Sequence, residues 1–253
     1  MPVPENPFKT ALAEGRTQIG LWQALASPIA AEICAGAGFD WIVLDGEHGP
    51  NDVPLLLAQL QAVAGRGAHP AVRVPIGEEW LIKQVLDLGA QTVIVPMVES
   101  AEHAARMVRA MHYPPEGVRG VGAALARASG YGATGDYVTT ANAQTCLVVQ
   151  VESRAALANL DAIAACKGVD GVFIGPADLA ADMGHPGNPA APQVRAAIDD
   201  AIARIIAAGK APGILSFDVE AARGYIDRGV RFVAVGADVT LLAGAARALA
   251  ARF

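Results

Sequence analysis

The sequence predicts an α/β fold in which residues 1–253 form a single (β/α)8 (TIM) barrel domain. Three observations predict it: the chain has the usual length of one such barrel, eight short apolar runs recur along it, and helical patterns separate these runs. With 53% hydrophobic and 17% charged residues the chain can bury a large core, which excludes a disordered protein. An open doubly wound sheet remains the alternative, because periodicity alone does not show that a sheet closes.

The eight apolar runs are the expected strands. Runs such as WIVLD, TVIVP and LVVQV are nearly continuous rather than alternating, which is typical of strands buried on both faces of a parallel sheet. In chain order the expected strands are Gln18–Leu25, Trp41–Asp45, Ala71–Pro75, Thr92–Met97, Thr145–Glu152, Gly171–Gly175, Ala211–Ser216 and Arg231–Gly236.

The segments between these runs carry helical patterns with recognisable ends. Asp52–Gly65 opens with an acidic cap, Pro28–Gly38 closes on glycine, and Ala101–Met111 stops before a pair of prolines. The other expected helices are Glu78–Leu88, Arg154–Cys166, Pro192–Ala208, Val219–Arg228 and Val239–Arg252.

Two longer intervals interrupt this alternation. Residues 113–144, rich in Gly, Ala and Thr, separate the fourth and fifth expected strands, and residues 176–192 follow the sixth. Long ordered insertions after a barrel strand usually line the active-site mouth, so we expect both segments there, where they would set substrate specificity.

Composition and charge exclude several classes of protein. The net charge is −6 and no Lys/Arg cluster stands out, so no nucleic-acid partner is expected. No apolar run reaches the roughly 18 residues of a membrane helix, and the N-terminus lacks a signal pattern, so we expect a cytoplasmic protein without a membrane partner. Cys34, Cys146 and Cys166 form no CxxC pattern, which favours reduced, mostly buried thiols over disulfides or a structural zinc site.

Polar side chains gather at the carboxyl ends of the expected strands, where barrels of this kind place their chemistry. Arg73 lies within an apolar strand, and a buried guanidinium needs an anion. Glu152 directly follows the run LVVQV, where a charge also needs a partner. The other polar groups at these ends are Trp22, the segment Asp45-Gly46-Glu47-His48, Gln150 and Asp178.

Several of these residues also have a structural explanation. Taken alone, Asp178 is better explained as a helix cap than as a metal ligand, His48 as a hydrogen-bonded loop residue, and Trp22 as packing rather than a pocket wall. Their joint pattern carries more weight, because Glu152 and Asp178 on adjacent strands supply two carboxylates to a hard divalent cation. Magnesium or manganese is expected, since these ligands are too few and too hard for structural zinc.

The Gly175-Pro176-Ala177-Asp178 turn adds a candidate anion site. Pro176 suits the first position of a helix, and the backbone N–H groups that follow can receive a substrate carboxylate. A 2-oxo acid that chelates the cation through its carboxylate and keto oxygens fits this arrangement.

At these residues the sequence resembles the HpcH/HpaI aldolase family, the class II pyruvate aldolases typified by 4-hydroxy-2-oxoheptanedioate aldolase. LDGEH, GVRG and GPADL are specific together, although each alone is weak. The resembling segments span nearly the whole chain in order: GLWQAL, WIVLDGEHGPND, AVRVP, LDLGAQTVIVPMVES, YPPEGVRGVGAALARAS, VVQVES and GVFIGPADLAADMG.

The resemblance implies roles that agree with the interpretation of the residues. Glu152 and Asp178 match the metal-binding carboxylates, here for Mg²⁺, Mn²⁺ or Co²⁺. His48 matches the proton-transfer histidine, and Arg73 matches the arginine that stabilises the enolate. Candidate substrate contacts are Trp22, Gln150, Gly175, Pro176, Ala177, Asp178 and Leu215.

Two aspartates are candidate partners of His48. The resemblance implies Asp87, which lies at the end of an expected helix away from the mouth, so that it would come from a neighbouring subunit. Asp45, three residues before His48, is the alternative within one chain. The resemblance also implies a homohexamer in which the C-terminal helix Val239–Arg252 is exchanged, whereas packing on its own barrel is the simpler expectation.

The implied reaction is reversible cleavage of 4-hydroxy-2-oxo acids into pyruvate and an aldehyde, with succinic semialdehyde as the aldehyde in the 4-hydroxy-2-oxoheptanedioate type. A 2-dehydro-3-deoxyglucarate aldolase, a CoA-thioester lyase and a non-catalytic binding barrel remain alternatives, and hydroxypyruvate remains open as a second donor. A Schiff-base mechanism is disfavoured because no lysine falls at a strand end that faces the mouth.

Overall fold

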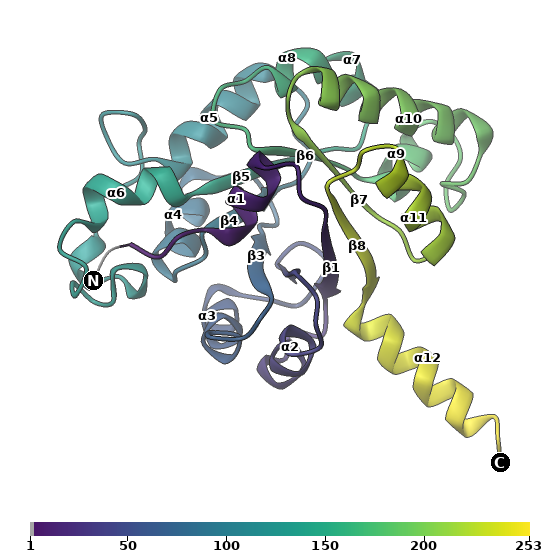
Figure 1. Cartoon of the computed structure of the whole chain (residues 1–253), viewed down its shortest axis with the longest axis horizontal. Coiled ribbons are helices and arrows are strands. Elements are labelled where there is room, and N and C mark those ends of the chain that lie inside the picture. Colours follow the sequence, from purple (N-terminus) through teal and green to yellow (C-terminus); the bar gives the residue numbers. More distant parts are fainter. Residues whose placement is uncertain (1–2) are drawn as a thin grey trace.

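The computed structural model describes residues 3–253 and shows a closed barrel of eight parallel strands in chain order (Figure 1). Each strand pairs with its sequence neighbours and β1 pairs with β8, so the expected barrel is confirmed and the open sheet is excluded. The strands are β1 (Gln18–Gln23), β2 (Trp41–Asp45), β3 (His69–Arg73), β4 (Thr92–Val95), β5 (Cys146–Val151), β6 (Gly171–Ile174), β7 (Ala211–Leu215) and β8 (Phe232–Ala237).

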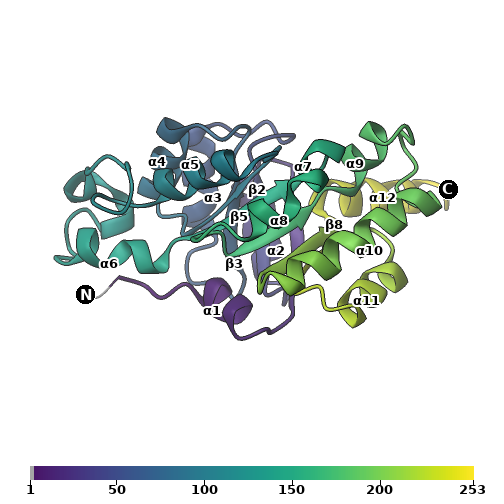
Figure 2. The ribbon, with the colours of Figure 1, turned by 90° about the horizontal axis from the view of Figure 1, so that it is seen from above.

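Helices surround the barrel in the expected alternation (Figures 1 and 2). Two 3-10 turns, η1 (Ala123–Leu125) and η2 (Arg127–Ser129), lie between α5 and α6. The helices are α1 (Pro7–Ala13), α2 (Pro28–Ala35), α3 (Val53–Ala62), α4 (Glu79–Asp87), α5 (Ala101–Met111), α6 (Tyr137–Gln144), α7 (Arg154–Ala158), α8 (Leu160–Ala164), α9 (Pro176–Asp182), α10 (Pro192–Ala207), α11 (Val219–Asp227) and α12 (Asp238–Ala250).

The expected helix Arg154–Cys166 is divided in two at Asn159. Asn159 ends α7 and precedes α8 with a backbone ψ of 4°, and its side-chain amide donates to the Glu99 carbonyl at 2.8 Å. A tertiary hydrogen bond of this kind competes with a continuous helix. The short helices α1 and α6 had no counterpart among the expected elements.

The interior of the barrel is filled by a cluster separate from the layer between strands and helices. Trp41, Phe173 and Phe232 point inward and lie ring against ring, with the Trp41 and Phe232 centroids 5.7 Å apart. Strand glycines make room for them: a Cβ on Gly213 would lie 2.1 Å from the Phe232 ring. The barrel is therefore a packed core that leaves only its ends for function.

The N-terminal end of the barrel is closed by α1. Phe8 packs against Trp41 and Phe232 and stacks on His69 with a ring separation of 5.9 Å. Asn6, which caps α1, also donates to the Thr92 hydroxyl at 3.0 Å. Chemistry that needs access from solvent is thereby directed to the opposite end.

The insertion at residues 113–144 is not where the sequence placed it. It follows α5 rather than β4, and α6 ends beside the start of the chain, where the Gln144 amide oxygen accepts the Asn6 backbone N–H at 2.8 Å. Connections from a helix to the next strand lie at the N-terminal end of a barrel. The expectation that this segment lines the mouth is therefore wrong within one chain.

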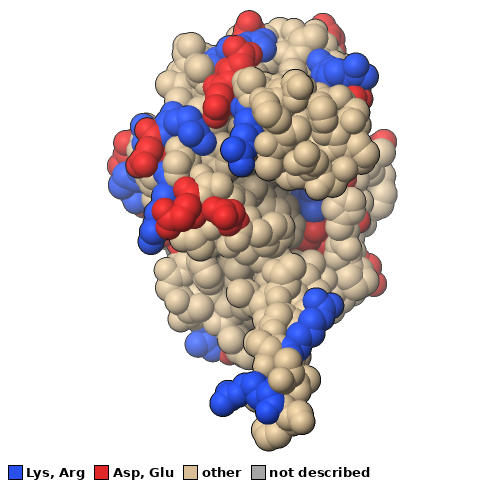
Figure 3. Space-filling model, turned by 90° about the vertical axis from the view of Figure 1, so that its right-hand side faces the viewer, with Lys and Arg blue, Asp and Glu red and all other residues tan. Residues whose placement is uncertain are grey.

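The C-terminal helix α12 projects away from its own barrel (Figure 1). Asp238 holds its first turn to β1 by accepting the backbone N–H groups of Ala24 and Leu25. Beyond that turn Leu241 and Leu242 are 57% and 60% exposed. Figure 3 shows the projection as tan apart from blue basic side chains. Packing of this helix on its own barrel, the simpler expectation, is wrong.

Two further expectations concern the cysteines and membrane contact. Cys34, Cys146 and Cys166 are free, and Cys146 is buried whereas the other two are partly exposed. Within residues 3–253, none of the helices combines the length and the apolar character that a membrane crossing requires.

Candidate active site at the C-terminal end of the barrel

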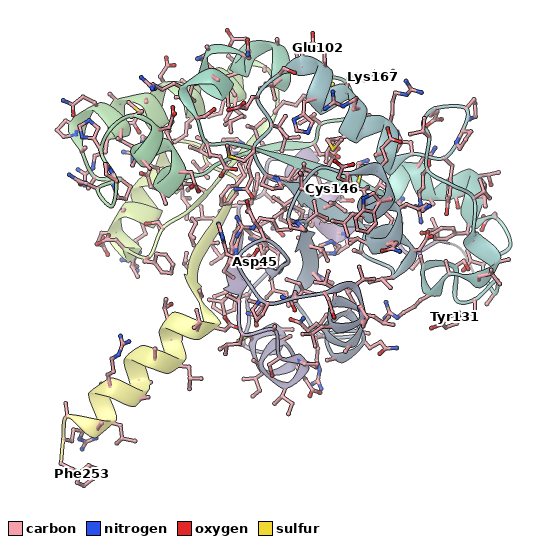
Figure 4. The ribbon with its side chains drawn as sticks, turned by 180° about the vertical axis from the view of Figure 1, so that it is seen from behind. Asp45, Glu102, Tyr131, Cys146, Lys167 and Phe253 are labelled. Carbon is pink, nitrogen blue, oxygen red and sulfur yellow. The ribbon has the colours of Figure 1, made fainter. Side chains whose placement is uncertain are left out.

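The candidate site lies where the strands end, at the end of the barrel opposite α1. Asp45 and Arg73 are the last residues of β2 and β3 and face each other in the register of the two strands. Gln150 is on β5, and Glu152 directly follows that strand. Figure 4 places Asp45 near the centre of the molecule, far from both Tyr131 and Phe253.

Arg73 and Asp45 form a bidentate ion pair. Arg73 Nε donates to Asp45 Oδ1 at 2.8 Å, and Nη2 donates to Oδ2 at 2.7 Å, with both side chains buried. Burial opposes ionisation of Asp45, but the Arg73 guanidinium outweighs it and lowers the pKa of this carboxyl. Arg73 thus has the anion that the sequence required, and the two parallel hydrogen bonds hold its guanidinium in one orientation.

Trp22 completes this pair from β1. Its indole N–H donates to Asp45 Oδ2 at 3.0 Å, and the Arg73 guanidinium carbon lies 4.8 Å from the centroid of its ring. Trp22 also packs against Phe173 in the barrel interior. It is therefore both a packing residue and a wall of the site, two roles that the sequence had treated as alternatives.

Glu47 is a site residue that the sequence interpretation did not select. Its carboxylate Oε2 lies 2.6 Å from Arg73 Nη1, on the side of the guanidinium away from Asp45. Burial raises the pKa of Glu47, with Arg73 opposing the rise. The sequence signal for Glu47 was its position between Asp45 and His48 at the end of a strand. Spacing alone does not show which of two neighbouring acidic residues points toward the barrel axis.

Glu152 is almost fully buried at the end of β5. Its Oε1 accepts the Met97 backbone N–H at 2.8 Å, and its Oε2 accepts from the Gln150 amide at 2.9 Å. Burial raises the pKa of Glu152 to about 7, and the charges of Glu47 and Asp178 add to the rise. Arg73 opposes this rise in the pKa of Glu152 but does not offset the effect of burial.

Asp178 lies in the first turn of α9, which begins at Pro176 as the sequence predicted. It is exposed and makes no capping hydrogen bond, so the capping explanation is not supported. Gly175, just before this helix, approaches Glu152 so closely that an added Cβ would lie 2.3 Å from Glu152 Oε2. The glycine keeps the space beside the buried carboxylate free of side chains.

The other candidate substrate contacts surround this cluster. Ala177 is exposed in the first turn of α9, and Pro176 is half-buried beside it. Leu215, the last residue of β7, packs on the edge of the interior cluster. These side chains are apolar, so they can border a ligand without forming ion pairs or hydrogen bonds with it.

His48 lies on the rim of the site. It is exposed, and its charge lowers the pKa of Glu47, which places it beside this carboxylate. Asp45 accepts the His48 backbone N–H at 3.4 Å, whereas both Asp45 carboxylate oxygens bind Arg73. Within residues 3–253 the His48 ring makes no hydrogen bond to Asp45, so the structure does not bring these two side chains together as a catalytic pair.

Asp87 lies away from the mouth, at the end of α4. Its Oδ1 accepts from Arg119 Nη2 at 2.7 Å, and the Asp87 side chain remains 27% exposed. Arg119 is buried against Tyr113, 4.3 Å from the centroid of its ring, and its Nε and Nη1 have no hydrogen-bond partner among the described residues. Within one chain Asp87 is therefore bound to Arg119 of the insertion at residues 113–144 and does not reach the site.

The acidic groups at the mouth are of the kind that binds a hard divalent cation. Glu152 and Asp178 are carboxylates that interact electrostatically, and the space beside Glu152 is kept open by Gly175. Within residues 3–253 no group of three or more His, Cys, Asp or Glu side chains has a metal-ligating arrangement. Two carboxylates with open positions suit a cation that also binds water and substrate.

Comparison with known proteins identifies a family that covers nearly the whole chain. The family model described as HpcH/HpaI aldolase/citrate lyase matches residues 18–245. A hydroxypyruvate/pyruvate aldolase of Deinococcus radiodurans is 62% identical over 98% of this chain and 90% of its own length. A 4-hydroxy-2-oxo-heptane-1,7-dioate aldolase of Klebsiella pneumoniae is 58% identical over 98% of this chain and 94% of its own.

Solved structures show the same similarity. A crystal structure of an HpcH/HpaI aldolase/citrate lyase family protein from Burkholderia cenocepacia superposes with a TM-score of 0.94. It is 42% identical in sequence and covers 98% of both chains. The similarity thus extends over the whole barrel and includes every strand end that contributes to the site.

Proposed function

The chain belongs to the HpcH/HpaI aldolase/citrate lyase family, and on that premise we propose that it is a class II pyruvate aldolase. The proposed reaction is the reversible cleavage of 4-hydroxy-2-oxo acids into pyruvate and an aldehyde. The observation that carries the proposal is the oriented Arg73 guanidinium, held by Asp45 at the same mouth as the carboxylates Glu152 and Asp178.

Arg73 stabilises negative charge on the enolate. Its Nε and Nη2 are engaged by Asp45, which leaves Nη1, now 2.6 Å from Glu47, as the donor that faces the mouth. A substrate oxygen that gains negative charge as the C3–C4 bond breaks can take the place of Glu47 at Nη1. Asp45 then acts as a positioning residue for Arg73 rather than as the partner of His48.

The carboxylates Glu152 and Asp178 hold a divalent cation, Mg²⁺, Mn²⁺ or Co²⁺. When bound, the cation supplies Lewis-acid polarisation of the keto group of a 2-oxo acid. Gln150 orients Glu152 through its amide, and Gly175 leaves room for a ligand beside that carboxylate. Trp22 and Leu215 border the substrate on the apolar side.

His48 transfers the proton. In the cleavage direction it accepts the proton of the C4 hydroxyl, directly or through a water molecule, and the aldehyde leaves as the C3–C4 electrons form the enolate. Protonation of the enolate at C3 then gives pyruvate. The exposed position of His48 on the rim suits exchange of this proton with solvent.

Hydroxypyruvate is the second candidate donor. The Deinococcus radiodurans relative, at 62% identity, carries both hydroxypyruvate and pyruvate in its name. A hydroxyl on C3 adds a polar group to the enolate, and Glu47 and Gln150 are polar side chains at the mouth that can receive it.

The functional unit is an oligomer, a hexamer in our proposal, in which α12 packs on a neighbouring subunit. The exposed leucines Leu241 and Leu242 support this proposal, because an apolar helix without a partner is costly in water. Assembly also gives Asp87 a route to His48 of a neighbour, since Asp87 lies on the surface away from its own mouth.

The experiment that tests the function is a metal-dependent aldolase assay with 4-hydroxy-2-oxoheptanedioate for cleavage, and with pyruvate or hydroxypyruvate plus a panel of aldehydes for synthesis. Dialysis against EDTA is expected to abolish activity, and Mg²⁺, Mn²⁺ or Co²⁺ to restore it. Arg73→Lys is expected to lower kcat by about 100-fold, because it removes a planar donor aimed at developing charge, while Arg195→Lys on exposed α10 remains fully active.

Two outcomes of this assay would contradict the proposal. A covalent adduct trapped by borohydride with pyruvate would replace it with a Schiff-base mechanism. Full activity of both Arg73→Lys and His48→Ala would show that the assigned residues do not carry the reaction. Activity on CoA thioesters in place of 2-oxo acids would favour the alternative lyase.

A further inference from the structure

A second cavity lies at the opposite end of the barrel from the mouth. Its volume is about 370 Å³, and it opens among segments that precede strands: residues 169–170 before β6, 209–212 at the start of β7, and Arg231 before β8. The helix α1 forms the remaining wall. Because these segments all lie at the N-terminal ends of strands, the cavity is separate from the site around Arg73.

Two charged groups in its lining neutralise each other. Lys9 Nζ lies 3.7 Å from Asp170 Oδ1 and donates to the Thr145 carbonyl at 2.7 Å. Asp170 Oδ2 accepts the Leu147 backbone N–H at 2.9 Å. Both groups are therefore engaged within the protein, and together they add no net charge to the cavity.

Lys210 and Arg231 are the uncompensated charges. Lys210 Nζ donates to the neutral carbonyl oxygens of Val169 at 2.7 Å and Cys166 at 3.5 Å. Its charge opposes the rise that burial causes in the pKa of Asp170, but it shares this single carboxylate with Lys9. Among residues 3–253 neither cation has a carboxylate within ion-pair distance, and the Arg231 guanidinium has no hydrogen-bond partner. The lining thus carries two excess positive charges in a chain whose net charge is −6.

The remaining walls are apolar or bare backbone. Leu12, Ile206 and Pro212 supply apolar surface, and Gly15 and Gly209 supply backbone without side chains. At about 370 Å³ the cavity is larger than a phosphate group needs. An organic group of several carbon atoms can lie against these walls while its anionic end meets the two cations.

We propose that this cavity binds a small metabolite that carries a phosphate monoester. Two excess positive charges match a dianion, and the Arg231 guanidinium offers the planar pair of donors that suits phosphate oxygens. Lys210 adds a point charge with a donor to spare, since an ammonium group has three. The site takes no part in the proposed aldol reaction and does not depend on it.

Binding has a physical consequence for the fold. Two cations that line one cavity repel each other, and a bound dianion converts this repulsion into attraction. A ligand that binds only the folded chain also stabilises it by mass action. Phosphate is therefore expected to raise the melting temperature of the protein more than the same ionic strength of a monovalent salt does.

The test is thermal unfolding of the full chain, with its divalent cation bound, in inorganic phosphate and in sodium chloride of matched ionic strength. A saturating phosphate concentration is expected to raise Tm by about 2 °C or more above the chloride value. The double variant Lys210→Gln/Arg231→Gln is expected to lose this rise. The matched control Lys167→Gln/Arg195→Gln removes two exposed cations outside the cavity and is expected to keep it.

A calorimetric titration with phosphate after dialysis against EDTA separates the site from the metal. The dissociation constant of phosphate is expected to weaken at least tenfold in the double variant, and in Arg231→Gln alone if the double variant does not fold. Aldol activity without phosphate reports that the variants are folded, because neither residue lies at the mouth. An equal Tm rise in variant and wild type, or no rise beyond chloride, overturns the proposal.

Discussion

The two edges of the Arg73 guanidinium have different surroundings. Nε and Nη2 face Asp45 and share both of its oxygens, whereas Nη1 faces Glu47 and lies 3.5 Å from the Gln150 amide oxygen. The Asp45 edge keeps the cation in one orientation, and the other edge meets groups that a ligand can replace. A lysine offers one charged atom without this division, so Arg73→Lys is not conservative at this position.

Gly175 gives a second prediction at the scale of a residue. In Gly175→Ala the new Cβ would lie 2.3 Å from Glu152 Oε2, so the carboxylate must move, while the backbone φ of −88° remains acceptable for alanine. Mn²⁺ affinity measured by calorimetry is expected to fall by about tenfold or more, as for other changes that displace a metal ligand.

Gly135→Ala is the matched control, because a Cβ at Gly135 would meet nothing within 4 Å. Its Mn²⁺ affinity and its far-UV circular dichroism are expected to equal those of the wild type. Unchanged Mn²⁺ affinity in Gly175→Ala would remove Glu152 from the proposed ligands.

At the scale of an element, α1 is a helix of only seven residues, and it stabilises the barrel through its tertiary contacts. It carries Phe8 into the N-terminal end of the barrel, beside His69 and the Thr92 hydroxyl. So short a helix has little intrinsic stability. Its amphipathic signal was correspondingly weak in the sequence, although its cap Asn6 and its first residue Pro7 are helix-start residues.

His69 makes the stability of this end depend on pH. Burial lowers the pKa of His69 from 6.5 to about 4, so the folded chain keeps this histidine neutral where the unfolded chain would protonate it. The contribution of neutral His69 to the free energy of unfolding is therefore fully present above about pH 6.5 and is lost as the pH falls toward 4. At pH 5 this histidine is expected to lower the free energy of unfolding by about 2 kcal/mol relative to pH 7.

Urea unfolding at pH 7 and pH 5 measures this effect. His69→Gln cannot take up a proton, so the difference between the two pH values is expected to shrink by about 2 kcal/mol. His185→Gln, outside the core, is expected to keep the wild-type difference. A pH dependence that is the same in His69→Gln and wild type would contradict the assignment.

At the scale of the whole molecule, one barrel exposes two features that need a neighbour. The helix α12, which ends near Phe253 at the tip of the projection in Figure 4, presents Leu241 and Leu242 to solvent. The buried Arg119 holds Asp87 at the surface by one carboxylate oxygen. A buried arginine with two nitrogens that lack a hydrogen-bond partner among the described residues is costly. A second copy that covers α12 would bury its leucines, and Asp87 at the surface is open to a neighbouring subunit, which is why we propose that the complete active site forms in an oligomer.

Mixing two inactive variants tests this arrangement. His48→Gln and Asp87→Asn are each expected to be inactive, and subunits mixed by co-expression are expected to regain about a quarter of wild-type activity if the two residues meet across a subunit boundary. Adding Leu242→Glu to both chains is expected to lower the molecular mass measured by light scattering and to prevent the recovery. No recovery in a mixed oligomer of full mass would place Asp87 outside the active site.

Closure of the sheet into a barrel was shown only by the tertiary structure, but the sequence by itself predicted the eight strands along the chain and the strand ends that carry Arg73 and Glu152. These follow from local information, because each apolar run and each capped helix is encoded within a few residues and parallel strands bring their carboxyl ends together. The family followed from the same segments, since LDGEH, GVRG and GPADL occur in one order along the chain.

Only the tertiary structure decided which charged groups meet and where the long segments lie. Asp45 binds Arg73 rather than the His48 ring, and Glu47 also binds Arg73. Residues 113–144 lie at the N-terminal end of the barrel because they follow the helix α5. Ion pairing depends on distances across strands that are far apart in the chain. The direction of α12 depends on tertiary contacts of its first turn, where Asp238 accepts the backbone N–H groups of Ala24 and Leu25, so neither could be derived from local pattern.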